Sequence, residues 1–328
     1  MLVDLHSHLE GRVRPETAED LARAAGVAVP VGGWAAALRL DAPTDLTGYL
    51  VKVAASYPLF QRLDAIERIA REAVEDAAAA GFDYLELRFG PATHADAERT
   101  LAEVIRAAAA GMRTASRATG MPSGLVVAAL RHHDEELNLA VARAAAALAG
   151  DGVVGFDLAG DELLFPRVEP YREAFRLASA AGLGLTCHAA EAAGASAARE
   201  AVELLGATRI GHGAHIADDP ETLAWAADSG VVVEVCPTSN HYTGAIAAVS
   251  EHPAPVMCDA GVRLVLGDDN PVQTGADLAH ERRVLTEVLG WTPDALAALD
   301  RDSIDAAFLT DGERHELLAR LAGGTGSP

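Results

Sequence analysis

The chain has 328 residues, half of them hydrophobic, and carries 26 basic against 48 acidic side chains. A formal net charge of −22 repels polyphosphate backbones and anionic membranes, so we expect neither a nucleic-acid nor a membrane partner. Three cysteines without a CxxC pair argue against a disulfide framework or a thiolate zinc site. No leader is recognisable and no apolar run approaches the about 20 residues of a membrane span, which predicts a cytoplasmic globular protein.

Short apolar runs alternate with helical segments rich in Ala, Leu, Glu and Arg. This alternation is typical of parallel strands joined by helical crossovers, and runs without polar alternation indicate strands covered on both faces. The eight runs are Leu2–Leu5, Tyr84–Leu87, Leu125–Leu130, Val153–Leu158, Leu183–Cys187, Thr208–Ile210, Val231–Val235 and Arg263–Leu266. We therefore predict an α/β fold, a (β/α)₈ TIM barrel, as one domain over residues 1–328.

The stretch between the first and second runs, about residues 11–81, is longer than one crossover requires. It predicts extra helices inserted after the first strand, the last of them in 64–81 with helical periodicity up to Gly81. We expect part of 45–60 to cover the site as a lid, with Leu50, Val53 and Tyr57 facing it. Ordinary packing of an amphipathic helix against the core is the alternative.

Unusual polar residues follow the predicted strands at their carboxyl ends, where barrels of this kind place their active sites. The first strand ends in His6-Ser7-His8, and side chains two positions apart on a strand point the same way. With His188 and Asp268 after later strands, the sequence offers three imidazoles and a carboxylate, a donor set suited to catalytic zinc. Bound zinc lowers the pKa of a water from about 15.7 toward 7 and so supplies hydroxide at neutral pH.

Further residues at the same strand ends can act beside such a metal. His212 lies between two glycines and can approach the metal-bound water as a base or an electrostatic partner. Glu191, if protonated, can donate to a ring nitrogen of a heteroaromatic substrate. Asp269 is free to bind substrate, and Gly160 lets a backbone N–H approach a ligand. In the alternative reading, His212 belongs to an ordinary glycine turn and Glu191 complements a helix macrodipole.

Taken together, the motifs resemble those of the adenosine deaminases of the amidohydrolase superfamily, essentially from end to end. They are HxHLxG, YLELRFGP, FDLAGDE, HAxE, RIGHG, CPTSN, the paired aspartates, DLAHE and AFLTDGERHELL. The resemblance implies a hydrolase acting on a C–N bond of a cyclic amidine. Its expected reaction is the zinc-dependent hydrolytic deamination of a 6-aminopurine nucleoside, adenosine or 2′-deoxyadenosine, to the 6-oxo product and ammonia.

The resemblance also implies a role for each candidate residue. One zinc ion per chain would be held by His6, His8, His188 and Asp268. Glu191 would donate a proton to purine N1, and His212 would assist the hydroxide. Asp269 would contact N7 through a hydrogen bond, and the Gly160 backbone would meet N3. The expected partner is therefore a small purine nucleoside, for a chain that is a monomer or a homo-oligomer.

Three positions depart from the family pattern. Ala190 replaces the glycine of the usual HAGE, which is tolerable unless that glycine needs a positive φ. The usual DDP reads Asp268-Asp269-Asn270-Pro271, interpreted here as a one-residue insertion. Glu10 replaces an aspartate that contacts the ribose 5′-hydroxyl, and in this it resembles adenine and aminodeoxyfutalosine deaminases. Adenine or a modified adenosine such as aminodeoxyfutalosine is thus the alternative substrate.

Two further readings come from other functional classes. The "DLHSH" opening also resembles that of polynuclear phosphoesterases of the polymerase-and-histidinol-phosphatase type, which need more histidines at other strand ends. His132 and His133 are the available ones, and we interpret them as part of a solvated polar loop. A non-catalytic binding protein on the same scaffold would lack a ligand or the acid, and none is missing here.

Overall fold

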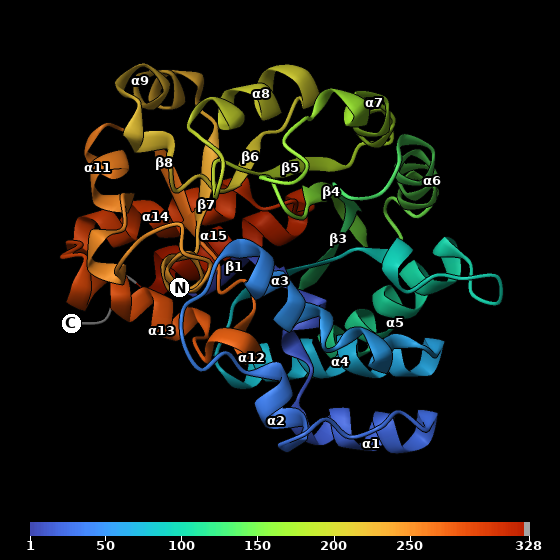
Figure 1. Ribbon diagram of the computed structural model, residues 1–328. Helices are drawn as coiled ribbons and strands as arrows, with labels where there is room; N and C mark the ends of the chain where they lie inside the picture. Colours follow the sequence, from blue (N-terminus) through green and yellow to red (C-terminus); the bar gives the residue numbers. More distant parts are fainter. Residues whose placement is uncertain (325–328) are drawn as a thin grey trace.

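Eight parallel strands form a barrel in chain order, and helices surround it (Figure 1). The computed structural model describes residues 1–324, so the last four residues of the predicted domain lie outside it. The strands are β1 (Val3–His8), β2 (Tyr84–Phe89), β3 (Ser123–Leu130), β4 (Val153–Ala159), β5 (Gly184–Ala189), β6 (Arg209–His212), β7 (Val232–Val235) and β8 (Arg263–Leu266). Each predicted apolar run overlaps one of these strands, with starts that differ by at most two residues, and the predicted TIM barrel is confirmed.

The barrel closes between β1 and the residues that follow β8. The backbone N–H of His8 donates to the carbonyl of Asp269, and the N–H of Asp269 donates to the carbonyl of His6, both at 2.8 Å. This pairing places Asp269 between the two histidines of the first strand.

The predicted insertion after the first strand is present. The chain forms α1 (Pro15–Ala25), α2 (Gly33–Leu38) and α3 (Leu46–Ala54) before α4 (Leu63–Ala79), the helix that leads into β2. Asp45 begins α3 by accepting a hydrogen bond from the Gly48 N–H at 2.7 Å. In Figure 1, α3 lies across the front of the barrel near β1.

The other helices connect successive strands or follow the last strand. They are α5 (Leu101–Thr119), α6 (Glu135–Ala146), α7 (Arg172–Ala180), α8 (Ser196–Leu205), α9 (Pro220–Ser229), α10 (Pro237–Tyr242), α11 (Ala254–Asp259), α12 (Pro271–Thr274), α13 (Leu278–Arg283), α14 (Pro293–Ala306) and α15 (Asp311–Gly324). In α5 a capping box of Thr100 and Glu103 begins the helix, and Gly120 ends it in the left-handed conformation. Within residues 1–324, no helix has the length and apolar character to span a membrane.

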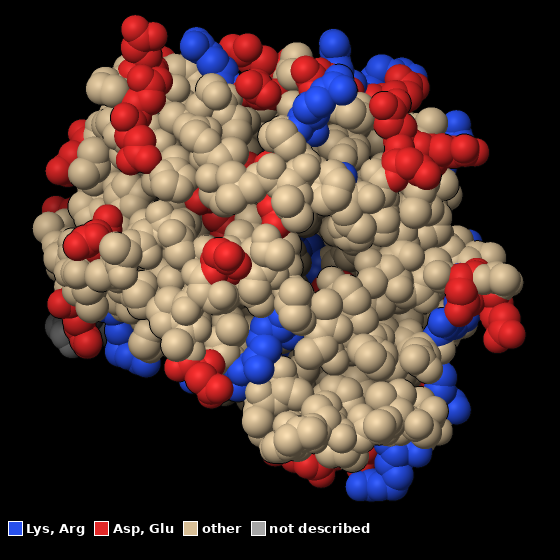
Figure 2. All heavy atoms as spheres, viewed as in Figure 1, with Lys and Arg blue, Asp and Glu red and all other residues tan. Residues whose placement is uncertain are grey.

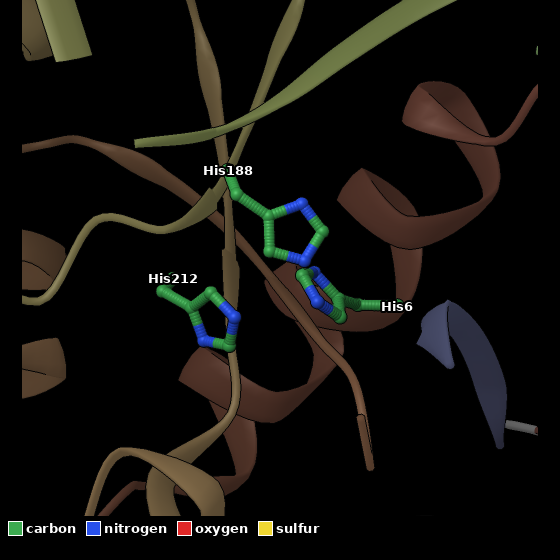
Figure 3. A group of neighbouring side chains, drawn as sticks. All are labelled: His6, His188 and His212. Atoms are coloured by element: carbon green, nitrogen blue, oxygen red, sulfur yellow. The ribbon is translucent and has the colours of Figure 1, made fainter. Parts of the chain in front are cut away.

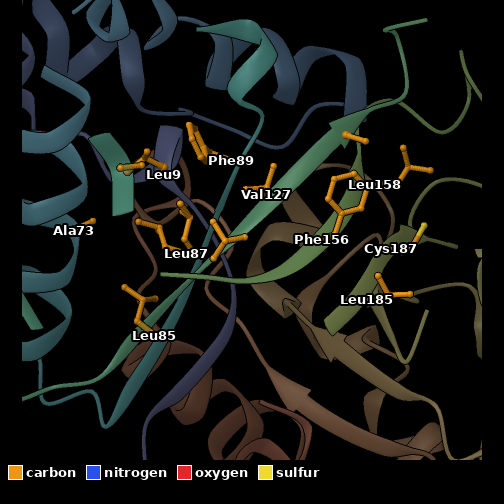
Figure 4. Packing of buried hydrophobic residues seen from close by; sticks show 14 of the residues in the cluster. Leu9, Ala73, Leu85, Leu87, Phe89, Val127, Phe156, Leu158, Leu185 and Cys187 are labelled. Carbon is orange, nitrogen blue, oxygen red and sulfur yellow. The ribbon is translucent and has the colours of Figure 1, made fainter. Parts of the chain in front are cut away.

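β2 presents apolar side chains to the helices and charged ones to the barrel interior. On β2, Leu85, Leu87 and Phe89 join the core between strands and helices (Figure 4). The intervening Glu86 and Arg88 are fully buried, as the period of two predicts for the opposite face. Inside the barrel Arg88 donates to Glu234 at 2.9 Å. Because an unpaired buried charge costs several kcal/mol, such pairing is what keeps these side chains ionised there.

Phe308 closes the end of the barrel opposite the strand carboxyl ends. Its ring lies against Gly155 on β4 and Gly184 on β5, where added Cβ atoms would approach ring carbons to 2.6 and 2.1 Å. The guanidinium of Arg209 stands 3.7 Å from the ring centroid, a cation–π contact. The absence of Cβ atoms at these two positions therefore leaves space for the Phe308 ring.

Candidate metal and active site

A cavity of about 340 Å³ opens at the carboxyl end of the strands. Its wall includes these predicted site residues: His8, Glu10, Gly160, His188, Glu191, His212 and Asp269. Leu50, Val53 and Tyr57 from the insertion also line it, as expected for a covering segment. Figure 2 shows a hollow near the middle of this face, surrounded mostly by side chains that are neither acidic nor basic.

His6 lies below the cavity in a space that only glycines leave open. A Cβ on Gly267 would come within 2.4 Å of the His6 Cβ, and one on Gly211 within 2.8 Å of the ring. The ring Nδ1 faces Glu234 at 2.7 Å and therefore carries the proton, which leaves a lone pair on Nε2. That Nε2 is buried and has no hydrogen-bond partner among the described residues.

His188 is oriented in the same way. Its Nδ1 stands 3.0 Å from a carboxylate oxygen of Asp157, a buried residue of β4. The Nε2 lone pair of His188 consequently faces the centre of the site, where the rings of His6, His188 and His212 meet (Figure 3). Burial lowers the pKa of His6 well below its ordinary value and that of His8 to about 4, so both rings are neutral at pH 7.

Four donor groups converge beside these rings with the spacing of a metal site. His8 Nε2 is 3.2 Å from His188 Nε2 and 3.3 Å from Asp269 Oδ1, and His6 Nε2 is 3.7 Å from the same oxygen. Ligands at about 2.0–2.1 Å from a tetrahedral ion lie about 3.4 Å apart. Lone pairs that face one another at this distance repel unless a cation lies between them. The residues therefore fit a four-coordinate metal ion.

The carboxylate in this group belongs to Asp269 and not to Asp268. Asp268 points away from the histidines: its two oxygens accept from Ser7 Oγ at 2.8 Å and from Arg12 at 2.5 Å. The predicted inclusion of Asp268 among the donors is therefore wrong in geometry, as is the reading of Asp269 as a residue free for substrate. Successive carboxylates cannot point to one centre, and the backbone pairing of Asp269 with His6 and His8 selects the second.

Asp269 is held by donors from three parts of the chain. Tyr49 of α3 and Ser239 of α10 donate to its Oδ2, at 3.1 and 2.5 Å, and Asn270 Nδ2 donates to Oδ1 at 2.7 Å. Its φ is +58°, rare for a residue other than glycine. If the usual DDP motif is aligned on Pro271, Asp269 and Asn270 take the places of its two aspartates and no insertion is needed. This alignment could have indicated Asp269 from the sequence.

Glu191 follows β5 and faces the cavity, as predicted. It is 4 % exposed, and its Oε1 has no hydrogen-bond partner among residues 1–324. Burial, reinforced by the carboxylates of Asp269 and Glu162, raises the pKa of Glu191 well above its usual range. This shift favours the protonated acid, the form that can donate a hydrogen bond. The preceding Ala190 has a φ of +53°, so the conformation that favours glycine is adopted here by alanine.

A chain of hydrogen bonds determines which nitrogen of His212 carries a proton. The backbone N–H of Ala254 donates to His252 Nδ1 at 3.1 Å, so the proton of His252 is on Nε2. That N–H faces Asn240 Oδ1 at 3.2 Å, which leaves Asn240 Nδ2 to donate to His212 Nδ1 at 3.1 Å. Each orientation follows from a backbone donor that cannot be reversed.

His212 consequently has its Nδ1 lone pair engaged and its proton on Nε2. Burial lowers the pKa of this ring to about 3, consistent with a neutral imidazole. Nε2 lies 3.6 Å from Glu191 Oε2 and faces the site. His212 was predicted to act as a base or as an electrostatic partner. With its proton on Nε2, the ring can donate a hydrogen bond into the site, which suits the second role.

Glu10 lies on the cavity wall with a partner that the sequence did not indicate. Its Oε1 is 3.0 Å from His94 Nε2, and the His94 ring stacks on Phe60 with centroids 4.3 Å apart. Gly160 also lines the cavity and has a φ of +113°, which requires glycine. His132 stands exposed at the cavity rim, and neither it nor His133 joins the central donors among the described residues.

Comparisons with known proteins show which family this chain belongs to. A family model described as adenosine deaminase matches residues 2–323. A relative named adenosine deaminase from Shewanella loihica is 36% identical over 98% of each chain. The solved structure of adenine deaminase from Arthrobacter aurescens has a TM-score of 0.90, with 25% identity over 99% of both chains. An amidohydrolase from Burkholderia ambifaria with bound zinc has a TM-score of 0.90 and 28% identity, covering 98% of this chain and 90% of the other.

Proposed function

Because this chain belongs to the adenosine deaminase family, we propose that it deaminates adenosine or 2′-deoxyadenosine hydrolytically, with one zinc ion per chain. The chain is a hydrolase acting on a C–N bond, and purine deamination is the reaction of its named relatives. The single observation that carries the finer proposal is the convergence of four donors at 3.2–3.7 Å beside the buried carboxyl group of Glu191, whose pKa burial raises.

We assign the zinc ligands as His6, His8, His188 and Asp269. His212 is left out because its Nδ1 accepts from Asn240 and its Nε2 bears a proton. When bound, zinc would supply a hydroxide at neutral pH. The N–H of His212 is placed to orient that oxygen by donating to it.

The remaining residues bind and protonate the purine. Glu191 gives its proton to N1, which draws electrons from C6 as water adds there and ammonia leaves. Asn270 lines the cavity beside Asp269, and an amide suits N7 because its N–H can donate to that acceptor. This replaces the expected contact between Asp269 and N7. Gly160 brings its backbone N–H toward N3 without a Cβ in the way.

The wall of the cavity favours a neutral nucleoside. None of its 24 lining residues is Lys or Arg, whereas Glu10 and Asp161 are acidic, so a 5′-phosphate would find no counter-charge. The volume of about 340 Å³ is in the range of sites for nucleoside-sized ligands, and is larger than a free base needs. Adenine remains the second candidate because Glu10 is longer than the aspartate of adenosine deaminases and an adenine deaminase shares the fold.

A substrate panel tests the proposal. Purified protein with measured zinc content would be given adenosine, 2′-deoxyadenosine, adenine and AMP, and loss of the adenine absorbance followed. We expect nucleoside turnover at about one zinc per chain, and kcat/KM for AMP at least about 100-fold lower, which corresponds to about 3 kcal/mol. Glu191→Gln is the matched control and should keep zinc while losing turnover. Faster turnover of adenine, or full activity of Glu191→Gln, would overturn the substrate or the mechanism respectively.

A further inference from the structure

Glu162 is a buried carboxylate directly after the "AGD" of the β4 end, and the reaction above assigns it no role. It is 1 % exposed. Its Oε1 accepts from the backbone N–H of Ala190, and its Oε2 accepts from those of Glu191 and Ala192, all at 2.9 Å. A fourth N–H, of Ala193, lies at 3.3 Å. One side chain thus satisfies four successive backbone donors.

The segment it holds is the one that carries Glu191. Residues 190–193 connect the end of β5 to the turn before α8, and their N–H groups converge because Ala190 is left-handed, with a φ of +53°. Successive N–H groups in such a turn form a concavity that binds an anion. Here the anion is supplied by the protein itself, from the neighbouring strand.

Arg131 ties this arrangement to the metal site. Its guanidinium is 3.7 Å from Glu162 Oε1 and donates to the carbonyl of His188 at 2.8 Å. A second donor of Arg131 reaches the carbonyl of Phe165 at 3.0 Å. The ends of β3, β4 and β5 are therefore joined at the point from which His188 and Glu191 project.

Alanine in a left-handed conformation costs of the order of 1 kcal/mol, and the turn persists only if its surroundings hold it. Without the carboxylate, four N–H groups would lose their acceptor and Ala190 would relax toward negative φ. Glu191 is the next residue, so its acid group would leave the position from which it meets the substrate.

We propose that Glu162 is a positioning residue for Glu191, holding the strained turn at 190–193 so that the acid projects into the cavity. The inference rests on the proposed function for its catalytic consequence. Its structural part, the holding of the turn, stands independently.

The test compares Glu162→Gln with the parent, with Ala190→Gly, and with the double variant. Gln places an N–H₂ group at one of the two oxygen positions, so at least the hydrogen bond from Ala190 and the negative charge that strengthens the others are lost at nearly constant volume. We expect kcat for adenosine to fall about 10- to 100-fold, with KM changed less than about threefold and zinc content equal to the parent. Amide hydrogen exchange at residues 190–193 should accelerate.

Glycine at 190 adopts a positive φ without strain, so Glu162→Gln/Ala190→Gly should recover at least about threefold in kcat. Glu72→Gln is the matched control: this buried carboxylate accepts from Thr17 and Arg68, outside the cavity lining, and should leave kcat at the parent value. Three outcomes would each overturn the proposal. They are an unchanged kcat in Glu162→Gln, a loss of kcat that only follows the zinc content or the folded fraction, and no recovery of kcat in the double variant. If the parent did not deaminate adenosine, the proposed function would fail while the exchange measurement still decided whether Glu162 holds the turn.

Discussion

Asp269→Asn and Asp268→Asn form a matched pair, because the same atom is changed in adjacent residues with opposite roles. Asparagine tolerates the left-handed φ of +58° at position 269, so Asp269→Asn removes a carboxylate while keeping the backbone. We expect it to weaken zinc binding by more than the about 10- to 100-fold that loss of an outer partner of a ligand costs. In the metal-free protein Ser239 and Tyr49 still find an oxygen, so we expect a loss of stability of about 1 kcal/mol, from the hydrogen bond that Asn270 donates to the other oxygen.

Asp268→Asn should show the reverse. The change breaks a buried ion pair with Arg12, for which the usual cost is about 3–5 kcal/mol. Two features place the loss near the lower figure. Arg12 keeps a second carboxylate, Asp4 at 3.1 Å, and removing the charge of Asp268 relieves the repulsion that raises the pKa of Asp4. We expect about 3 kcal/mol less stability and one zinc per chain.

Metal analysis after dialysis against a weak chelator, together with urea unfolding of the metal-free proteins, separates the two variants. Stoichiometric zinc in Asp269→Asn and none in Asp268→Asn would refute the assignment. It would show that the paired aspartates are used in the order first read from the sequence.

Three further changes test other parts of the structure. Burial raises the pKa of Glu281 to about 8 from an unfolded value near 4.5, so its contribution to stability is complete below pH 4.5 and declines as the pH rises to 8. Glu281→Gln should therefore stabilise the metal-free protein by about 3 kcal/mol at pH 7 and hardly at all at pH 4.5, and a pH-independent difference in urea unfolding would contradict this. In Asn240→Asp, a carboxylate oxygen replaces the amide N–H₂ that donates to His212 Nδ1, so the His212 proton should move to Nδ1. We expect kcat to fall about 100-fold at constant zinc content, and nitrogen NMR of the ring to report the tautomer. Thr47→Val removes the 2.6 Å bond from α3 to Asp161 across the cavity mouth, so KM should rise about fivefold at unchanged kcat in steady-state kinetics.

Local patterns predicted most of the scaffold. The eight apolar runs coincide with the eight strands because short apolar runs that alternate with helical segments are typical of parallel strands. His6 and His8 lie near the same centre, as the period of two requires, and His188 and Glu191 face it because they lie at and just after the carboxyl end of β5.

The sequence did not predict contacts between strands that are distant along the chain. Asp269 was predicted to contact substrate and not to lie among the donors, because the choice between two adjacent carboxylates depends on how the end of β8 pairs with β1. Asn240 and Glu162 stood inside motifs, yet their roles depend on partners, His252 and the turn at 190–193, that only the folded chain brings near. His94 gave no signal of its own, since its partner Glu10 is 84 residues away.

The Phe308 ring covers charged side chains inside the barrel. The ring fills the space that Gly155 and Gly184 leave at the amino ends of β4 and β5, and it lies against the Arg209 guanidinium. It thereby helps to cover Arg209, which is 1 % exposed and pairs with Glu234 inside the barrel. We expect Phe308→Ala to admit water at the amino ends of the strands, where it would screen the charges that orient the His6 ring. Position 308 would then affect the site although it lies at the opposite end of the barrel.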